Sequence, residues 1–202
     1  MIGSVITQDF IAFARSRFRL DWQGIHGAPH WSRVRHNGLL IAEHYKVDTT
    51  VIQWFAFFHD LERHDDWKDP LHGHRAATLA AEINAEFMAL SDAQLCLLQA
   101  ACLGHSEGQT QADPTVMVCW DADRLDLGRV GIYPNPQYLC TSFSRQAHVI
   151  AEAHDRSVPR DGDSHNPDGG VSEAIDFPEV EEPDIDLNEL LPAMDDWQTP
   201  DY

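Results

Sequence analysis

The chain has 202 residues, of which 43% are hydrophobic, and a formal net charge of −19. That length supports one globular domain with a hydrophobic core, and so negative a surface repels the phosphate backbone of duplex nucleic acid. No apolar run approaches the roughly 20 residues that span a bilayer. The first residues, MIGSVITQDFIAF, lack the basic region of a signal peptide. We therefore expect a cytoplasmic protein with no membrane contact.

Hydrophobic residues recur with helical spacing through most of residues 4–127. The pattern predicts a first helix around Ile6, Phe10 and Phe13, then helices at about 31–45, 51–61 and 70–87. A further helix contains LCLLQAACL, another contains VMVCWDADRLDL, and one more is possible at 141–155. Because no segment alternates like a strand, we expect an all-α bundle of about six helices.

Four local signals mark where these helices begin. Asp48, Asp69-Pro70 and Asp113-Pro114 are typical of a capping residue, in two cases followed by proline. Ser91 with Gln94 forms a capping-box pattern. Gly38, inside its helix, indicates either a close approach of two helices or a tolerated glycine.

The acidity is concentrated at the C-terminus. Residues 157–202 carry one basic and 14 acidic side chains, with frequent proline and glycine. Such composition predicts disorder, so we divide the chain into a helical domain at 1–156 and an acidic tail at 157–202. Six apolar residues of the tail could form a short amphipathic helix that binds an unknown protein partner, although a solubilising tail is the simpler interpretation. They are Ile185, Leu187, Leu190, Leu191, Met194 and Trp197.

The four cysteines, Cys96, Cys102, Cys119 and Cys140, form no CxxC pair. We expect buried, reduced thiols rather than a cysteine metal site or a disulfide framework.

Histidines and aspartates that could bind a metal are widely spaced along the chain. His59-Asp60 ends the apolar run VIQWFAFF, where two polar side chains are costly unless they are paired or bind an ion. The other two His-Asp pairs, at 64–65 and 154–155, have polar neighbours. Nitrogen and carboxylate ligands without thiolate suit manganese, iron, cobalt, nickel or zinc.

Five motifs together resemble the HD-domain superfamily of metal-dependent phosphohydrolases. They are HWSRV (30–34), FFHDLER (57–63), HGHRAA (72–77), LGHSEG (103–108) and DADRLD (121–126), in the order of the family. The resemblance covers about residues 25–133. It implies a compact HD-type helical bundle and one or two divalent metal ions, with magnesium added to the metals above.

By this resemblance the metal ligands are His30, His59, Asp60, His74, His105 and Asp123, with Asp60 bridging if two ions bind. Two choices stay open. Asp121 competes with Asp123, and we prefer Asp123 because it fits the family's alanine-aspartate pattern. His72 competes with His74, and we prefer His74 because it directly precedes a small-residue helix face.

The resemblance also implies hydrolysis of a small phosphorylated substrate, with a nucleotide as the default, by a water that the metal activates. Asp60 is expected in the catalytic centre. Glu62 or His64 is expected to protonate the leaving group, although the family's usual glutamate position is occupied here by Arg63. Arg33, Arg63 and Arg124 are the expected phosphate-binding residues. Four tryptophans near the motifs either stack a base or belong to the core, namely Trp22, Trp31, Trp54 and Trp67.

Two other functions remain compatible with the same residues. Some HD-like proteins with this six-ligand pattern hold a diiron pair and oxygenate an organic substrate. An HD fold can also serve as a nucleotide-binding module without catalysis.

Overall fold

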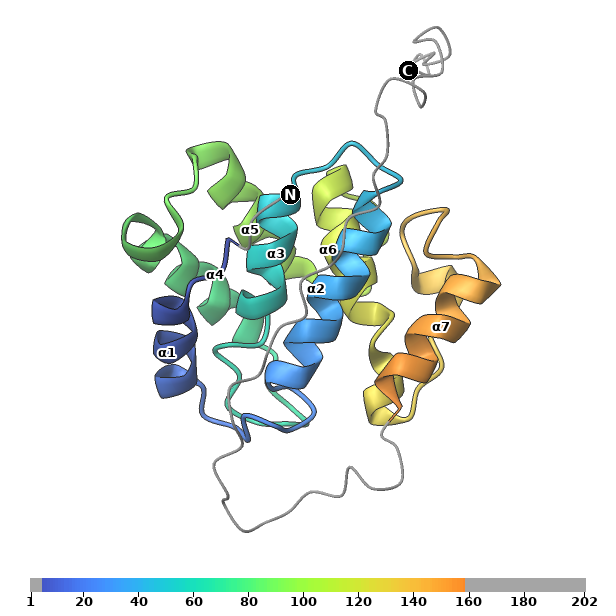
Figure 1. The fold of residues 1–202 in the computed structure, drawn as a ribbon, viewed down its shortest axis with the longest axis horizontal. Helices are drawn as coiled ribbons and strands as arrows, with labels where there is room; N and C mark the ends of the chain where they lie inside the picture. Colours follow the sequence, from blue (N-terminus) through green and yellow to red (C-terminus); the bar gives the residue numbers. More distant parts are fainter. Residues whose placement is uncertain (1–4, 159–202) are drawn as a thin grey trace, which may run out of the picture.

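The computed structural model describes residues 5–158, and within this range the chain forms seven α-helices and no strand. The expectation of a compact all-α protein is thereby confirmed (Figure 1). The helices are α1 (Gln8–Arg17), α2 (Ala28–Ala42), α3 (Thr49–Phe58), α4 (His72–Ile83), α5 (Asp92–Gly104), α6 (Pro114–Arg124) and α7 (Ala147–Ser157). A π-helical turn, Asn84–Met88, extends α4, and 3-10 turns lie at Leu127–Val130 and Pro136–Tyr138.

Three of the predicted helix starts are correct. The carboxylate of Asp48 accepts hydrogen bonds from the first turn of α3, and that of Asp113 caps α6, which has Pro114 in its first turn. Ser91 and Gln94 form the complete capping box of α5. These side chains satisfy amide groups that the first turn of a helix leaves without partners.

Two helix starts differ from the prediction. Helix α2 begins three residues early, at Ala28, because Gly27 takes an extended conformation before it and Pro29 suits the first turn. Helix α4 begins at His72 rather than at Pro70. Asp69 does not cap it, because its carboxylate accepts the backbone N–H of His64 and pairs with Arg75 instead.

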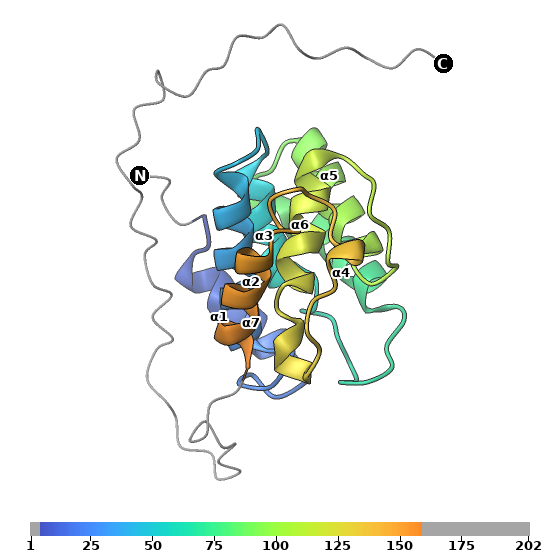
Figure 2. The same cartoon turned by 90° about the vertical axis from the view of Figure 1, so that its right-hand side faces the viewer.

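Helices α2 and α3 lie side by side in the middle of the molecule (Figure 1). Helix α6 packs against both, α5 packs against α3 and α6, and α4 packs against α5. Turned by 90°, the bundle shows α7 in front of α2, next to the chain segment that follows α6 (Figure 2).

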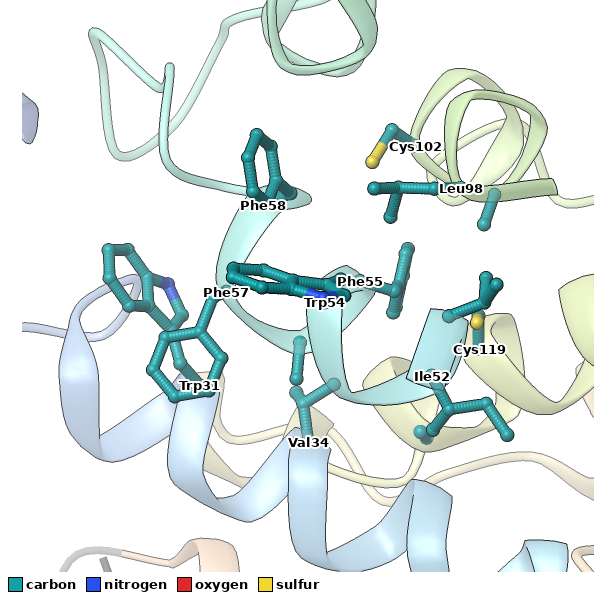
Figure 3. Close-up of a cluster of buried hydrophobic side chains, with 14 of the residues drawn as sticks. Trp31, Val34, Ile52, Trp54, Phe55, Phe57, Phe58, Leu98, Cys102 and Cys119 are labelled. Carbon is teal, nitrogen blue, oxygen red and sulfur yellow. The ribbon is translucent and has the colours of Figure 1, made fainter. Parts of the chain in front are cut away.

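Helix α3 is the centre of the hydrophobic core. All of its residues from Val51 to Phe58 are buried, including Gln53. Figure 3 shows aromatic side chains of α3 between Trp31 and Val34 of α2 on one side and Leu98 and Cys102 of α5 on the other. A helix that is apolar on every face needs partners all around it, and the polar residues that follow Phe58 are therefore held inside the bundle.

Two glycines allow helices to approach closely. A Cβ atom on Gly38 would lie 2.5 Å from Cγ2 of Ile52, so α2 meets α3 at this point, and the close-approach interpretation of Gly38 is confirmed. A Cβ atom on Gly73 would lie 2.3 Å from the carbonyl oxygen of Cys102. Real Cβ atoms do not come so close to backbone, so Gly73 fixes the contact between α4 and α5.

No helix among residues 5–158 is long and apolar enough to cross a membrane. All four cysteines are free, and three are buried, but Cys96 is exposed on the outer face of α5, contrary to the expectation. The predicted domain boundary falls within the last turn of α7. The rest of the acidic tail, with its amphipathic segment, lies outside the described residues.

Candidate metal centre

Four buried histidines come from the ends of four helices. His30 lies in the first turn of α2, and His59 directly follows α3. His72 is the first residue of α4, and His105 directly follows α5. None of the four side chains is more than 4% exposed. Residues 13 to 75 positions apart in the sequence are thus brought together only by the packing of the bundle.

Each of these histidines has its Nδ1 atom on an oxygen atom. His59 Nδ1 lies 3.2 Å from the carbonyl oxygen of Phe55, His105 Nδ1 lies 2.7 Å from that of Cys102, and His72 Nδ1 contacts that of Asp69. A carbonyl oxygen can only accept a hydrogen bond, so Nδ1 carries the proton in all three rings. The Nε2 atom of each ring is then left with a lone pair.

His30 is arranged in the same way by a carboxylate. Its Nδ1 atom lies 2.6 Å from Oδ2 of buried Asp126. Burial raises the pKa of Asp126, but Arg33 donates two hydrogen bonds to the same carboxyl group, at 2.6 and 3.0 Å, and holds it as an acceptor. His30 therefore also directs an Nε2 lone pair inward.

The Nε2 atoms converge in two pairs. His30 Nε2 and His59 Nε2 are 2.9 Å apart, and His72 Nε2 and His105 Nε2 are 2.7 Å apart. Two lone pairs at this distance repel each other unless a cation lies between them. Burial lowers the pKa of His30, His72 and His105, so a proton is disfavoured as that cation and a metal ion suits the arrangement.

Asp60 faces both pairs. Its Oδ2 atom lies 3.6 Å from His30 Nε2 and 3.5 Å from His59 Nε2. Its Oδ1 atom lies 3.3 Å from His72 Nε2 and 3.9 Å from His105 Nε2. Burial alone would raise the pKa of Asp60, but His59 and His26 hold it well below its usual range. The carboxylate is thus ionised and offers one oxygen to each pair.

Asp123 completes the first pair. Its Oδ1 atom lies 3.4 Å from His30 Nε2 and 3.8 Å from His59 Nε2, and it is buried without a hydrogen-bond partner. Burial would raise the pKa of Asp123, but His59 and Arg129 lower it. A buried, charged oxygen without a donor is costly unless it binds a cation. The residues present therefore fit a metal ion.

Two groups of side chains could hold an ion. The first centre is His30, His59 and Asp60, with Asp123 beside them, and the second centre is Asp60, His72 and His105. Within each group of three the ligand atoms lie within 4.8 Å of one another. Nitrogen and carboxylate ligands suit divalent first-row metal ions such as manganese, iron and zinc. Because no thiolate is present in either group, copper(I) and iron–sulfur clusters are disfavoured.

Four of the six predicted metal ligands lie in these two groups and Asp123 lies beside the first, whereas His74 is in neither. Its side chain is exposed on α4, and with Leu97 and Trp120 it lines a separate surface hollow of about 520 Å³. Residues two apart on a helix point about 200° away from each other, so only one of His72 and His74 can face the bundle. The structure places His72 there.

Asp121 and Asp123, the two candidates for the last metal ligand, lie in different surroundings. Asp121 is buried on the other side of α6, where its carboxylate accepts the backbone N–H groups of Cys140 at 2.6 Å and Thr141 at 2.8 Å. Asp121 thus holds the segment before α7 against the bundle. Asp123 is the aspartate that lies beside the histidines.

Three residues with predicted catalytic or substrate roles lie away from the histidines. Glu62 turns towards α1 and pairs with Arg17, and His64 is exposed. Arg124 is buried and donates a hydrogen bond of 2.7 Å to the carbonyl oxygen of Tyr138. The positions of these three side chains do not suit the catalytic and phosphate-binding roles predicted for them. Arg33 pairs with Asp126, whereas Arg63 donates a hydrogen bond to Asp60 of the second centre.

Three residues near the cluster were not assigned from the sequence. His26 Nδ1 lies 2.9 Å from Asp60 Oδ2, Asp126 orients His30, and Arg129 Nη2 lies 3.7 Å from Asp123 Oδ1. The i, i+3 spacing of 123, 126 and 129 is a helical-face signal that could have indicated the last two. His26 carries no such signal, because it precedes α2 in an irregular loop.

Comparison with known proteins adds no family. Neither family models, nor curated proteins, nor solved structures gave a match. The case for a metal centre therefore rests on the chain's own geometry.

Proposed function

We propose that the protein is a metal-dependent phosphohydrolase that acts on a nucleotide or another small phosphate ester. The observation that carries the proposal is the convergence of four histidine Nε2 lone pairs and two ionised carboxylates in a buried centre. The order of the HD-type motifs along the chain supports the same reaction class, as does the contact of His59-Asp60 with residues in or next to four other helices, α2, α4, α5 and α6.

A divalent ion held there would activate a water molecule and neutralise charge on the phosphoryl oxygens. The protein's own groups account for the rest of the chemistry. Asp60 and Asp123 supply the negative charge that retains the ion, and Asp126 keeps His30 in the ligand tautomer. Asp123, with 14% of its side chain exposed, is the most exposed of the six cluster residues, so a substrate reaches the centre on this side.

The proton for the leaving group is assigned to His26 in place of Glu62 and His64. Its Nε2 atom lies 3.1 Å from the carbonyl oxygen of Asp66, and its Nδ1 atom faces the carboxylate of Asp60. Both ring nitrogens thus face acceptors, an arrangement that is fully satisfied when both carry a proton. An imidazole that lies between two acceptors at the edge of the centre is suited to general acid catalysis.

One tryptophan supports a nucleotide as the substrate. Trp31 and Trp54 are part of the core, whereas Trp67 is 84% exposed. It follows Asp66, which contacts His26, so its ring lies on the loop that borders the centre. An exposed indole beside a phosphate-binding centre is suited to stacking on a base.

The test is phosphate release by the full-length protein loaded with Mn²⁺, using nucleoside mono- and triphosphates and p-nitrophenyl phosphate. We expect His59→Ala to lose both metal and activity. The matched control His74→Ala should keep both, because His74 is exposed and outside the centres. Oxygen consumption by the iron-loaded protein, without phosphate release, would instead establish the oxygenase. A nucleotide that raises the melting temperature without turnover would establish a binding module.

A further inference from the structure

The second centre already contains a cationic side chain. Arg63 Nη1 lies 3.2 Å from Asp60 Oδ1 and 3.2 Å from His72 Nε2. These are two of the three ligand atoms that a metal ion in the second centre would use. The guanidinium group donates hydrogen bonds to the same lone pairs and supplies the positive charge that they require.

The position of Arg63 is fixed from both sides. It follows Asp60 by three residues in the turn after α3, which brings its side chain over the same face. Its Nε atom donates a hydrogen bond of 3.0 Å to the carbonyl oxygen of Asp65. Only 13% of the side chain is exposed. The guanidinium is thus held at the centre by three hydrogen bonds and partial burial.

In the first centre the close donor is an imidazole, since His26 Nδ1 lies 2.9 Å from Asp60 Oδ2, and among the described residues the Nε2 atoms of His30 and His59 have a hydrogen-bond contact only with each other. The nearest arginine, Arg129, lies 3.7 Å from Asp123 Oδ1, and its Nε and Nη1 atoms already bond to the carbonyl oxygens of Ile25 and Asp126. Asp123 Oδ1 keeps no hydrogen bond. The two centres therefore differ, because the histidine Nε2 lone pairs of the first are free for an ion, whereas in the second the lone pairs of Asp60 Oδ1 and His72 Nε2 are shared with an arginine.

We propose that Arg63 is the resident cation of the second centre, so that the protein holds one metal ion tightly in the first centre and binds a second ion only by displacing this arginine. The inference deepens the proposed function and rests on its metal centre. A divalent ion and a guanidinium group at this separation repel each other strongly inside a protein. They cannot share the lone pairs of Asp60 and His72.

The consequence for a phosphate substrate is specific. A guanidinium group beside the first centre offers planar hydrogen-bond donors to phosphoryl oxygens, which a second metal ion would otherwise neutralise. Arg63 then has the substrate-binding role expected from the sequence, but it performs that role from within the metal cluster rather than from its rim.

The test compares Mn²⁺ binding by the full-length wild type, Arg63→Met and the control Arg17→Met. Arg17 also pairs with an acidic residue after α3, but it does not contact either centre. Bound ions are counted by element analysis after dialysis, affinities come from titration calorimetry, and electron paramagnetic resonance detects two manganese ions coupled through Asp60.

We expect one tight ion in the wild type and in Arg17→Met, and two ions with a coupled spectrum in Arg63→Met. The second ion should bind roughly 10- to 100-fold more tightly in this variant, as loss of one competing charge-assisted hydrogen bond implies. Arg63→Lys, a matched variant that keeps the charge, should resemble the wild type more closely. Adding His72→Ala to Arg63→Met should remove the second ion and leave the first.

Two results would overturn the inference and leave the phosphohydrolase proposal standing. One is a wild type that binds two ions with similar affinity, and the other is an Arg63→Met variant that still binds one. Absence of any ion in all variants, with a folded protein by circular dichroism, would overturn the metal-dependent function together with the role of Arg63.

Discussion

The carboxylate of Asp126 lies 2.6 Å from Nδ1 of His30, although 96 positions separate the two residues. Both side chains are buried, and the contact joins the first turn of α2 to the segment that follows α6. A carboxylate in this place fixes the tautomer of a metal-binding histidine and makes the ring a stronger ligand. The same carboxylate also binds Arg33, so one residue organises both an inner ligand and a nearby cation.

Replacing Asp126 by asparagine should therefore weaken metal binding without removing a ligand. The amide can present its NH₂ group to Nδ1, which favours the tautomer with the proton on Nε2. We expect a loss of about 10- to 100-fold in Mn²⁺ affinity, measured by titration calorimetry. Asp155→Asn, at a side chain that is 86% exposed, is the control and should bind as the wild type does. Equal affinities in both variants would contradict the orienting role.

Asp121 and Asp123 should separate stability from metal binding. Asp123→Asn removes an ionised oxygen beside His30 and His59, so we expect metal affinity to fall while the apo protein stays folded. Asp121→Asn weakens the acceptor of two buried backbone N–H groups. It should lower the free energy of unfolding by about 1–3 kcal/mol and leave metal stoichiometry unchanged. Chemical denaturation and metal analysis of both variants check this. If Asp121→Asn lost metal and Asp123→Asn lost stability instead, Asp121 would be the metal ligand and Asp123 the structural residue.

Much of the fold was predictable because its signals are local. The caps at Asp48, Ser91 and Asp113 fix three helix starts through contacts within a few residues. The apolar run before His59 also made its burial predictable, since a helix that is hydrophobic all round must lie inside the bundle. The other residues expected beside His59 were implied by the resemblance of the five motifs, not by that burial.

The remainder depended on contacts that no local pattern contains. The choice between His72 and His74 requires the rotational phase of α4, and that phase is set where Gly73 meets the backbone of Cys102 on another helix. His72 and His74 point about 200° apart on the helix, so the sequence pattern alone left both residues as candidates. Arg63 and Glu62 present the same difficulty, because α3 ends at Phe58 and the chain continues through turns whose side-chain directions the helical period does not give.

The contact at Gly73 gives a direct test of how the bundle positions its second centre. Alanine at this position would bring a Cβ atom within 2.3 Å of the carbonyl oxygen of Cys102 and 3.3 Å of Cε1 of His105. Backbone must move to relieve this contact, so we expect a loss in the upper part of the range of about 1–3 kcal/mol typical of overpacking. Thr78→Ala, on the exposed face of α4, should change stability by less than about 0.5 kcal/mol. Denaturant unfolding in the presence of a chelator measures the free energy of unfolding of both variants. Equal values for Gly73→Ala and Thr78→Ala would show that α4 and α5 can move apart without cost.

The histidines predict how the stability of the metal-free protein depends on pH. Burial, first of all, lowers the pKa of His30, His72 and His105 below the usual 6.5. Just below pH 6.5 the unfolded chain therefore binds more protons than the folded chain, and the free energy of unfolding falls as the pH falls. Each histidine contributes at most about 1.4 kcal/mol per pH unit, so the slope from the three together stays below about 4 kcal/mol per unit and fades as the pH rises above the usual 6.5.

Urea unfolding in EDTA between pH 5 and 8 measures this slope. His64→Gln should follow the wild type, because His64 is exposed, whereas His72→Gln should show a shallower curve by about one histidine's share. Mn²⁺ should raise stability most at the upper end of the range, since protons and metal compete for the same Nε2 lone pairs. A stability that stays constant from pH 7 to 5 would mean that these rings bind protons in the folded protein as they do in the unfolded chain, and burial would then not be what keeps protons off their Nε2 atoms.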